Sequence, residues 1–369
     1  MPKDTTTAKI TIDARDLTRA LRFAMQVVKR RSTIPILSCN LFRFADDKLT
    51  IIGTDLDIEC EASCEAESER IEAARFVMDG RQLLAFAAMT TGLIHISIGE
   101  GEITIAADGA VMTLRNLLPP EDWPVWVEGE GKPVAMRVGE ADMRRALHRV
   151  RHCISTEETR YYLNGVHWCA HPETKALRLV TTDGHRMAIY DLDQSFGAKP
   201  FILPKKTAEI LYRALRKDGN GDVAMIVAEN GLKAVIETPA GVIRSKMIDG
   251  NYPDYTRVLL QAEAKIACTV GEAMIRRLMV VSGKFARAVA FRPEEKRVTC
   301  RDPYGNEIAI PMQFTGEPIK SFGFNGGYLI DHCRAAGGAI RISGSGHGDP
   351  FRILSDDPRA LWVQMPMLV

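Results

Sequence analysis

The sequence predicts an α+β protein that is built from three similar domains. Three observations predict this class: one segment that occurs three times, a second set of strand-to-helix starts between its copies, and short β-rich runs elsewhere. The chain has 369 residues, which is enough for two or three domains. The simplest build gives each domain two helices, each combined with several antiparallel strands.

The first repeated segment joins the end of a strand to a helix. Its copies at residues 12–21, 138–147 and 270–279 align without gaps. Each copy has apolar residues three and four positions apart, which is the spacing of one helix face. Arg19, Arg145 and Arg277 occupy the same position in the three copies.

The second set of starts lies between these copies. Short apolar runs at 76–78, 201–203 and 322–324 lead into further segments with helical spacing. Asp79, Pro204 and Asn325 stand near the three helix starts, where such residues suit a cap or a first turn.

The rest of each third is predicted to form strands that are separated by turns. The pairs Asp108-Gly109 and Asp183-Gly184 predict tight turns between β-rich runs. Residues 57–65 alternate strictly, which predicts a strand with one buried face and one acidic face in water.

Two proline-rich linkers divide the chain. Residues 119–124 and 249–253 each end in an aromatic residue followed by proline. These linkers and the repeat predict domains at residues 1–130, 131–257 and 258–369.

Composition excludes several classes of protein. Hydrophobic residues make up 46% and charged residues 26%, which excludes a disordered, collagenous or coiled-coil chain. The 48 Lys and Arg against 47 Asp and Glu exclude a uniformly basic nucleic-acid coat, but they allow local basic faces. No window has the ~18 apolar residues that a membrane helix needs, and residues 1–12 lack a signal-peptide core. We therefore expect a cytoplasmic protein.

The eight cysteines are scattered and form no C-x-x-C pair. This pattern predicts small, reduced core residues and argues against a zinc or redox site.

Positive charge gathers on the predicted helices. A solvated charged face explains any single helix, but the shared position of Arg19, Arg145 and Arg277 favours a basic helical surface for phosphates. Contacts of this kind would be independent of nucleotide sequence and sensitive to salt.

Catalytic motifs such as G-x-x-x-x-G-K-[ST], H-E-x-x-H and G-x-S-x-G are absent from the sequence. His185 and Asp183 could perform acid–base chemistry, so a hydrolase or transferase stays open as an alternative. The Asp183-Gly184 pair is first of all a hairpin turn.

Several motifs together resemble the bacterial DNA polymerase III beta subunits, the sliding clamp family. They are residues 160–165 (RYYLNG), 182–186 (TDGHR), 249–255 (DGNYPDY) and 365–367 (MPM), with similar segments at 33–37 and 53–56. The resemblance spans the whole chain. It implies a DNA-clamp fold in which each of three domains has two helices and two small antiparallel sheets. Two chains would then pair head to tail into a ring around duplex DNA, as a processivity factor that is not an enzyme and needs no cofactor or metal.

The resemblance also implies a peptide pocket for polymerases, the clamp-loader delta subunit and mismatch-repair proteins that carry a short motif with Gln and Leu or Phe. Its residues would be Arg160, Tyr162, Leu163, Thr182, Gly184, His185, Arg186, Met187, Pro253, Arg257, Val258, Asn325, Tyr328, Val363, Met365, Pro366 and Met367. Methionines suit a groove that accepts many peptides, because their side chains adapt.

For DNA, the resemblance implies contacts from Arg31, Tyr161 and Tyr162. The basic helix faces add Arg15, Arg19, Arg22, Arg145, Arg149, Lys206, Arg213 and Arg277. We expect such a protein to be nucleoid-associated.

Two departures from the family stand out. Many members end in Met-Pro-Met-Arg-Leu, whereas this chain ends in Leu368-Val369 and lacks that arginine at the rim of the pocket. Met187 stands where leucine is common, which is nearly neutral in volume. The altered ending leaves a specialised clamp paralogue as a second alternative.

Overall fold

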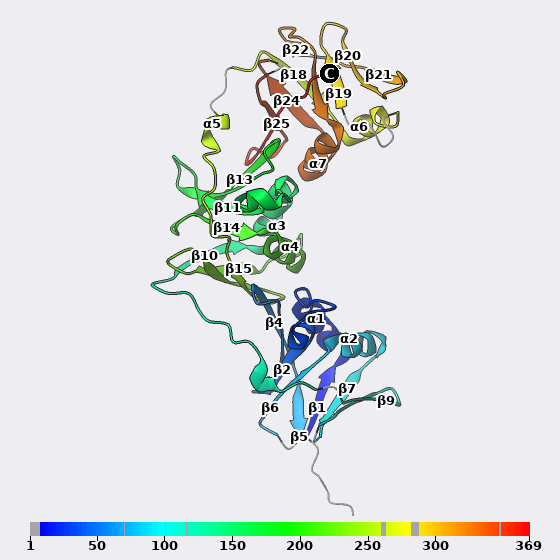
Figure 1. Ribbon diagram of the computed structural model, residues 1–369, viewed down its shortest axis with the longest axis vertical. Helices are drawn as coiled ribbons and strands as arrows, with labels where there is room; N and C mark the ends of the chain where they lie inside the picture. Colours follow the sequence, from blue (N-terminus) through cyan, green and yellow to red (C-terminus); the bar gives the residue numbers. More distant parts are fainter. Residues whose placement is uncertain are drawn as a thin grey trace, which may run out of the picture. The chain divides into compact units, whose positions relative to one another are not determined.

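The computed structural model describes residues 8–69, 71–99, 101–115, 117–259, 263–281, 288–346 and 348–369. The chain forms two compact units (Figure 1). Unit 1 comprises Met1–Ala141 and Arg213–Lys246, and unit 2 comprises Asp142–Tyr212 and Met247–Val369. Within the described residues, no helix is both long and apolar enough to cross a membrane.

Two antiparallel sheets and a helix pair make up most of the described part of unit 1. The first sheet has the order β5 (Glu67–Glu69), β1 (Ala8–Asp13), β7 (Leu93–Ile98), β8 (Ile103–Ala107) and β9 (Ala110–Leu114). The second has the order β10 (Val134–Gly139), β15 (Asp222–Val227), β16 (Lys233–Thr238), β17 (Gly241–Lys246), β4 (Ile58–Glu65), β3 (Lys48–Thr54), β2 (Asn40–Ala45) and β6 (Ala73–Met78). Helices α1 (Ala14–Ala24) and α2 (Gly80–Met89) pack against each other (Figure 1).

Unit 2 repeats this architecture. Its larger sheet has the order β14 (Phe201–Pro204), β11 (Gly165–Ala170), β12 (Ala176–Thr182), β13 (Arg186–Ser195), β26 (Ala360–Gln364), β25 (Phe351–Leu354), β24 (Ile340–Gly344), β18 (Ile266–Val270) and β22 (Thr315–Gly316). Its smaller sheet has the order β21 (Glu307–Pro311), β20 (Arg297–Arg301), β19 (Ala288–Arg292) and β23 (Phe322–Asn325). Helices α6 (Glu272–Leu278) and α7 (Gly326–Ala336) pack together, and α5 (Thr256–Leu259) is a single short turn.

The remaining helical elements are two longer helices and several short 3-10 helices. Helices α3 (Glu140–Val150) and α4 (Lys205–Ala214) have residues in both units. The short 3-10 helices are η1 (Pro35–Ser38), η2 (Pro120–Asp122), η3 (Arg151–Cys153) and η4 (Glu158–Leu163).

The predicted strand-to-helix starts are confirmed. The first repeat gives β1–α1, β10–α3 and β18–α6, and the second gives β6–α2, β14–α4 and β23–α7. Asp79 caps α2 by accepting a hydrogen bond from the backbone N–H of Arg81, and Asn325 caps α7 by accepting one from Gly327. These side chains satisfy backbone donors that the first turn of a helix leaves unpaired.

The predicted turns and core cysteines are confirmed as well. Asp108 and Gly109 join β8 to β9 with positive φ angles of 52° and 79°, a conformation that suits an Asp-Gly hairpin. All eight cysteines are buried and free. The prediction for residues 57–65 was right about the strand and about the exposure of Asp57 and Glu65, but it was wrong about Glu59 and Glu61, which are covered.

The correction concerns β4. Glu59 is buried, because β17 pairs with β4 and brings Arg244 within 2.9 Å of its carboxylate. Glu61 accepts from the same guanidinium at 2.8 Å. A neighbouring strand from a distant part of the sequence therefore covers acids that a single-strand pattern assigns to solvent.

Glu140 shows how repeat-equivalent positions differ in their surroundings. Its side chain is 1% exposed, and its oxygens accept hydrogen bonds from the backbone N–H groups of Arg216 at 2.8 Å and Gly221 at 3.3 Å. Glu272 occupies the same position of the next repeat copy, but it is 33% exposed and pairs with Arg276 and Arg334.

This contrast predicts different costs for the two alanine substitutions. Glu140→Ala leaves two backbone donors without their carboxylate partner, so we expect the free energy of unfolding to fall by about 2 kcal/mol or more. Glu272→Ala removes surface ion pairs and should cost about 0–1 kcal/mol. Denaturant unfolding of both variants measures this difference, and equal losses would contradict the buried role of Glu140.

Candidate functional site

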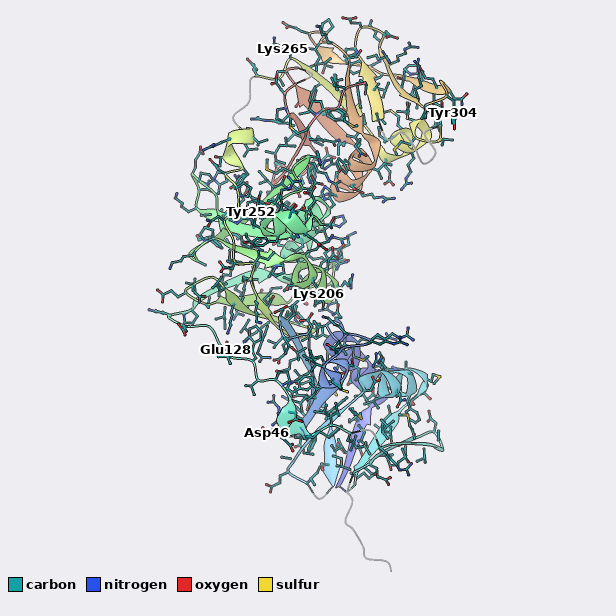
Figure 2. The ribbon with its side chains drawn as sticks, in the orientation of Figure 1. Asp46, Glu128, Lys206, Tyr252, Lys265 and Tyr304 are labelled. Atoms are coloured by element: carbon teal, nitrogen blue, oxygen red, sulfur yellow. The ribbon has the colours of Figure 1, made fainter. Side chains whose placement is uncertain are left out.

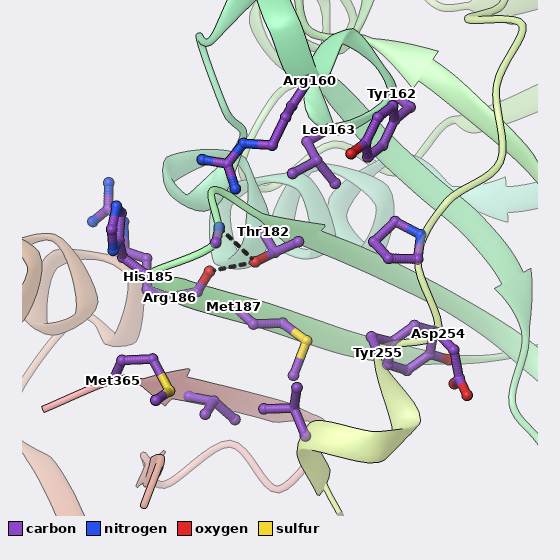
Figure 3. A pocket seen from close by; sticks show the side chains of 14 residues that line it. Arg160, Tyr162, Leu163, Thr182, His185, Arg186, Met187, Asp254, Tyr255 and Met365 are labelled. Atoms are coloured by element: carbon purple, nitrogen blue, oxygen red, sulfur yellow. Dashed lines mark hydrogen bonds between the residues drawn. The ribbon is translucent and has the colours of Figure 1, made fainter. Parts of the chain in front are cut away.

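Unit 2 contains a pocket of about 300 Å³ that four separate segments surround (Figure 3). These are η4, the hairpin between β12 and β13, the segment that leads into α5, and the end of β26. The lining residues are Arg160, Tyr162, Leu163, Thr182, Gly184, His185, Arg186, Met187, Pro253, Asp254, Tyr255, Val258, Val363 and Met365.

The hairpin that forms one side of the pocket is locked by its own polar side chains. The Thr182 hydroxyl donates to the carbonyl of Arg186 at 2.8 Å and accepts from the N–H of Gly184 at 3.1 Å (Figure 3). One carboxylate oxygen of Asp183 accepts from the backbone N–H groups of His185 and Arg186, both at 3.0 Å. Gly184 has a φ of +88°, which favours glycine. The turn therefore fixes where His185 leaves the backbone.

These contacts bear on the alternative of a hydrolase or transferase. Asp183 is occupied by the backbone of its own turn and by the Arg186 side chain at 3.0 Å, so its carboxylate has a structural role. The geometry gives no support to a catalytic pair of Asp183 and His185.

Arg186 supports the wall of the pocket from behind. Its side chain is only 10% exposed, and its guanidinium pairs with Asp183 at 3.0 Å and with Asp331 at 2.8 Å. It also donates to the carbonyl of His152 at 2.7 Å and lies 4.0 Å from the ring centroid of Tyr328. One buried cation thus connects the hairpin with η3 and α7.

The floor of the pocket is apolar and rests on two adjacent strands. Met187 on β13 lies directly opposite Val363 on β26, and both side chains are buried. Leu163 is also buried, whereas Met365 is 39% exposed at the edge (Figure 3). A rigid apolar floor therefore ends in a flexible, partly exposed thioether.

Aromatic contacts position the wall opposite the hairpin. Tyr252 stacks on His167 with ring centroids 4.4 Å apart, and the Tyr255 hydroxyl lies 3.5 Å from the Cys169 sulfur. These contacts hold Pro253 and α5 beside the larger sheet of unit 2 (Figure 2 labels Tyr252). The sequence analysis missed Asp254 and Tyr255 as lining residues, although both belong to the 249–255 motif that it used.

Five residues predicted for the pocket lie outside its lining. Arg257 is exposed and pairs with Asp254, Asn325 caps α7, and Tyr328 lies under Arg186. Pro366 is also outside the lining, and Met367 exchanges two backbone hydrogen bonds with Gly323.

Most residues predicted to contact DNA are exposed. Arg19 and Arg145 each pair with an aspartate three residues earlier on their helix, Asp16 and Asp142, at 2.8 Å. Two of the three repeat copies thus share this ion pair, whereas the third has Met274 at the position of the aspartate. The other exposed residues of the set are Arg15, Arg22, Arg31, Tyr161, Lys206, Arg213 and Arg277 (Figure 2 labels Lys206).

Arg149 and Tyr162 differ from the rest of the set. The Arg149 side chain is 15% exposed, donates to the carbonyl of Ala335 and lies 3.6 Å from a carboxylate oxygen of Asp357. These internal contacts leave Arg149 poorly placed for a phosphate. Tyr162 is half-buried and lines the pocket.

Removing the buried guanidinium provides a test of the pocket wall. Arg186→Met leaves Asp183 and Asp331 without their shared cation, so we expect a loss of about 3 kcal/mol or more in the free energy of unfolding. Arg160→Met is the matched control, because Arg160 is 36% exposed and pairs with Glu157 on the surface. It should cost about 0–1 kcal/mol in denaturant unfolding. Similar losses in both variants would contradict the supporting role of Arg186.

Comparison with known proteins places the chain in a family. Residues 8–127 match the N-terminal domain of the DNA polymerase III beta subunit, and residues 137–254 match its central domain. The beta sliding clamp of Caulobacter vibrioides is 30% identical, with 98% of this chain and 100% of the relative covered, and that of Pseudomonas putida is 28% identical, with 87% and 88% covered.

Solved structures agree with this placement. A crystal structure of the Caulobacter crescentus beta sliding clamp superposes with a TM-score of 0.88 at 29% identity, covering 98% of this chain and 99% of that one. A Pseudomonas aeruginosa clamp bound to griselimycin gives 0.89 at 26% identity, covering 98% and 100%. The chain therefore belongs to the family of beta sliding clamps, the DNA polymerase III beta subunits that act as processivity clamps of the bacterial replicative polymerase.

Proposed function

We propose that two copies of this chain close head to tail around duplex DNA and hold polymerases there through the pocket of unit 2. The observation that carries the proposal is the pocket itself, in which four segments far apart in sequence combine an apolar floor with a polar rim. Each chain contributes three domains to the ring, at residues 1–130, 131–257 and 258–369. The protein acts by topology and not by catalysis.

The chemistry of the pocket suits a short peptide with apolar anchors. Buried Met187 and Val363 offer a surface for Leu or Phe side chains, while partly exposed Met365 can adapt to different partners. Arg160 and His185 stand at the rim, where they can donate to peptide carbonyls or acidic groups. We propose as partners the replicative and other polymerases, the clamp-loader delta subunit and mismatch-repair proteins with a motif containing Gln and Leu or Phe.

The exposed arginines of the helices suit the DNA duplex. Arg19, Arg145 and Arg277 recur at one repeat position, and each can contact phosphates without reading bases. Such contacts would keep the protein near the nucleoid while the ring slides.

Substituting two methionines near the C-terminus tests the pocket. Met365→Ala removes an exposed apolar edge, so we expect about tenfold weaker binding of a fluorescent peptide with the Gln and Leu/Phe motif. Met367 is equally exposed but does not line the pocket, so Met367→Ala should change affinity less than about twofold. Fluorescence polarisation measures both. If Met367→Ala weakened binding more than Met365→Ala, the pocket would be assigned to the wrong residues.

Native mass spectrometry tests the ring. A single chain weighs 40.9 kDa, and an open arc would leave unpaired sheet edges that favour association. We therefore expect a species of twice that mass at micromolar concentration. A monomer whose mass does not change with concentration would refute the ring.

Retention on circular and on cut DNA tests whether the protein stays on DNA because its ring is closed or because its charges attract phosphates. A ring placed on circular DNA should persist at physiological salt, and it should slide off within minutes after one double-strand cut. Arg19→Glu with Arg145→Glu should impair loading, because phosphate contacts contribute to binding in a salt-dependent way.

The matched control for this experiment is Arg75→Glu with Arg341→Glu. It makes the same charge change on exposed strand residues, one in each unit, as in the test pair. It should load normally. Equal retention on circular and cut DNA would refute the clamp mechanism, whereas normal loading of the helix variant would refute only the assigned DNA face.

A further inference from the structure

Unit 2 contains a cluster of two histidines and a cysteine next to Arg186, a residue that lines the pocket. His152 and Cys153 belong to η3, and His332 comes from α7. The Nε2 atom of His152 lies 3.0 Å from Nδ1 of His332, and ligand atoms of all three residues lie within 4.8 Å of one another. Cys153 and His332 have no exposed surface. Peptide and DNA binding, as proposed above, do not use these groups.

We propose that His152, Cys153 and His332 form a binding site for one transition-metal ion, and that zinc fits the site best. Two imidazoles and one thiolate are a donor set that zinc prefers, and three protein ligands leave one tetrahedral position for water. Hard cations such as magnesium and calcium prefer oxygen ligands, which these three side chains do not supply.

The distances in the cluster agree with such a site. Zinc–nitrogen bonds of about 2.0–2.1 Å and a zinc–sulfur bond of about 2.3 Å place neighbouring donor atoms about 3.3–3.6 Å apart in a tetrahedron. The two imidazole nitrogens are already 3.0 Å apart. The ligand atoms of all three residues lie within 4.8 Å of one another, so the side chains must draw closer together to bind the ion.

The two imidazole rings make few hydrogen bonds through their nitrogen atoms. One hydrogen bond joins the two rings, while Nδ1 of His152 and Nε2 of His332 have no hydrogen-bond partner among the described residues. Buried polar atoms in folded proteins normally have hydrogen-bond partners, but these two nitrogens have none within the described part of the chain. Binding an ion would therefore break only the hydrogen bond between the two rings.

Binding of the metal releases one proton. A metal ion binds cysteine as the thiolate, so the Cys153 thiol gives up its proton to solvent when the ion enters. The two histidines bind the ion as neutral imidazoles.

The charged side chains near the cluster can balance the charge of a bound metal ion. Arg186 is a cation close to the cluster, because its guanidinium donates to the His152 carbonyl. Asp183 and Asp331 both pair with Arg186, so these three side chains carry one net negative charge. A divalent ion and the Cys153 thiolate together add one positive charge, which brings the group to neutrality.

The position of the site gives it a consequence for the pocket. The Arg186 guanidinium binds both the His152 carbonyl on η3 and the Asp331 carboxylate on α7. A metal ion bound by the cluster would therefore add a second link between η3 and α7, beside the one that Arg186 makes. Because the ion binds the folded chain, zinc should raise the thermal stability of unit 2.

Cobalt titration of the full-length chain tests the proposal. The protein is first stripped with a chelator, and Co²⁺ is then added as a spectroscopic substitute for zinc. We expect one Co²⁺ per chain, a thiolate-to-cobalt charge-transfer band, and loss of the band when zinc is added. Zinc should also raise the melting temperature of the stripped protein.

Substitutions identify the ligands. Cys153→Ala and His332→Gln should each lose the charge-transfer band and the stabilisation by zinc. Cys333→Ala is the matched control, because Cys333 is a buried free thiol beside His332 that lies outside the cluster. It should keep both signals. Absence of the band in the unsubstituted chain, or its survival in Cys153→Ala, would overturn the proposal, and the first measurement needs no variant to fold.

Discussion

Arg186 carries a full positive charge on a side chain that is only 10% exposed, and this charge must be balanced locally. Two carboxylates, a carbonyl and a tyrosine ring surround it, and they come from the hairpin, η3 and α7. Breaking a buried pair of this kind leaves an uncompensated charge, so the three elements are held to one arrangement. The hairpin beside the pocket and the strand that carries Met187 follow from that arrangement.

The sequence allowed the local features of the fold to be predicted. Strand-to-helix starts, the caps at Asp79 and Asn325, and the Asp108-Gly109 turn depend on residues a few positions apart, and all were found. The clamp fold followed from the resemblance. Features that join distant segments could not be inferred in this way. Arg244 covers Glu59 only because β17 pairs with β4, and no residue pattern within either strand predicts that pairing.

The candidate site shows the same division. The sequence motifs predicted most of the residues that line the pocket, because each motif contributes one segment to it. The internal contacts of Arg149 with Ala335 and Asp357 were missed, because helical periodicity gives a residue's face but not what packs against that face. The cluster of His152, Cys153 and His332 was missed for a related reason. Its two histidines are 180 residues apart, so no ligand spacing appears in the sequence.

The ion pairs shared by α1 and α3 explain how arginines could contact DNA phosphates weakly and reversibly. Arg19 and Arg145 each share their charge with an aspartate that is 41% exposed. Exposed pairs of this kind contribute about 0–1 kcal/mol, so a phosphate can compete for the guanidinium at little cost. The aspartate also offers the arginine a partner as soon as the phosphate moves on. Each of the proposed DNA contacts would therefore form and break easily, which suits a clamp that is retained on DNA by a closed ring.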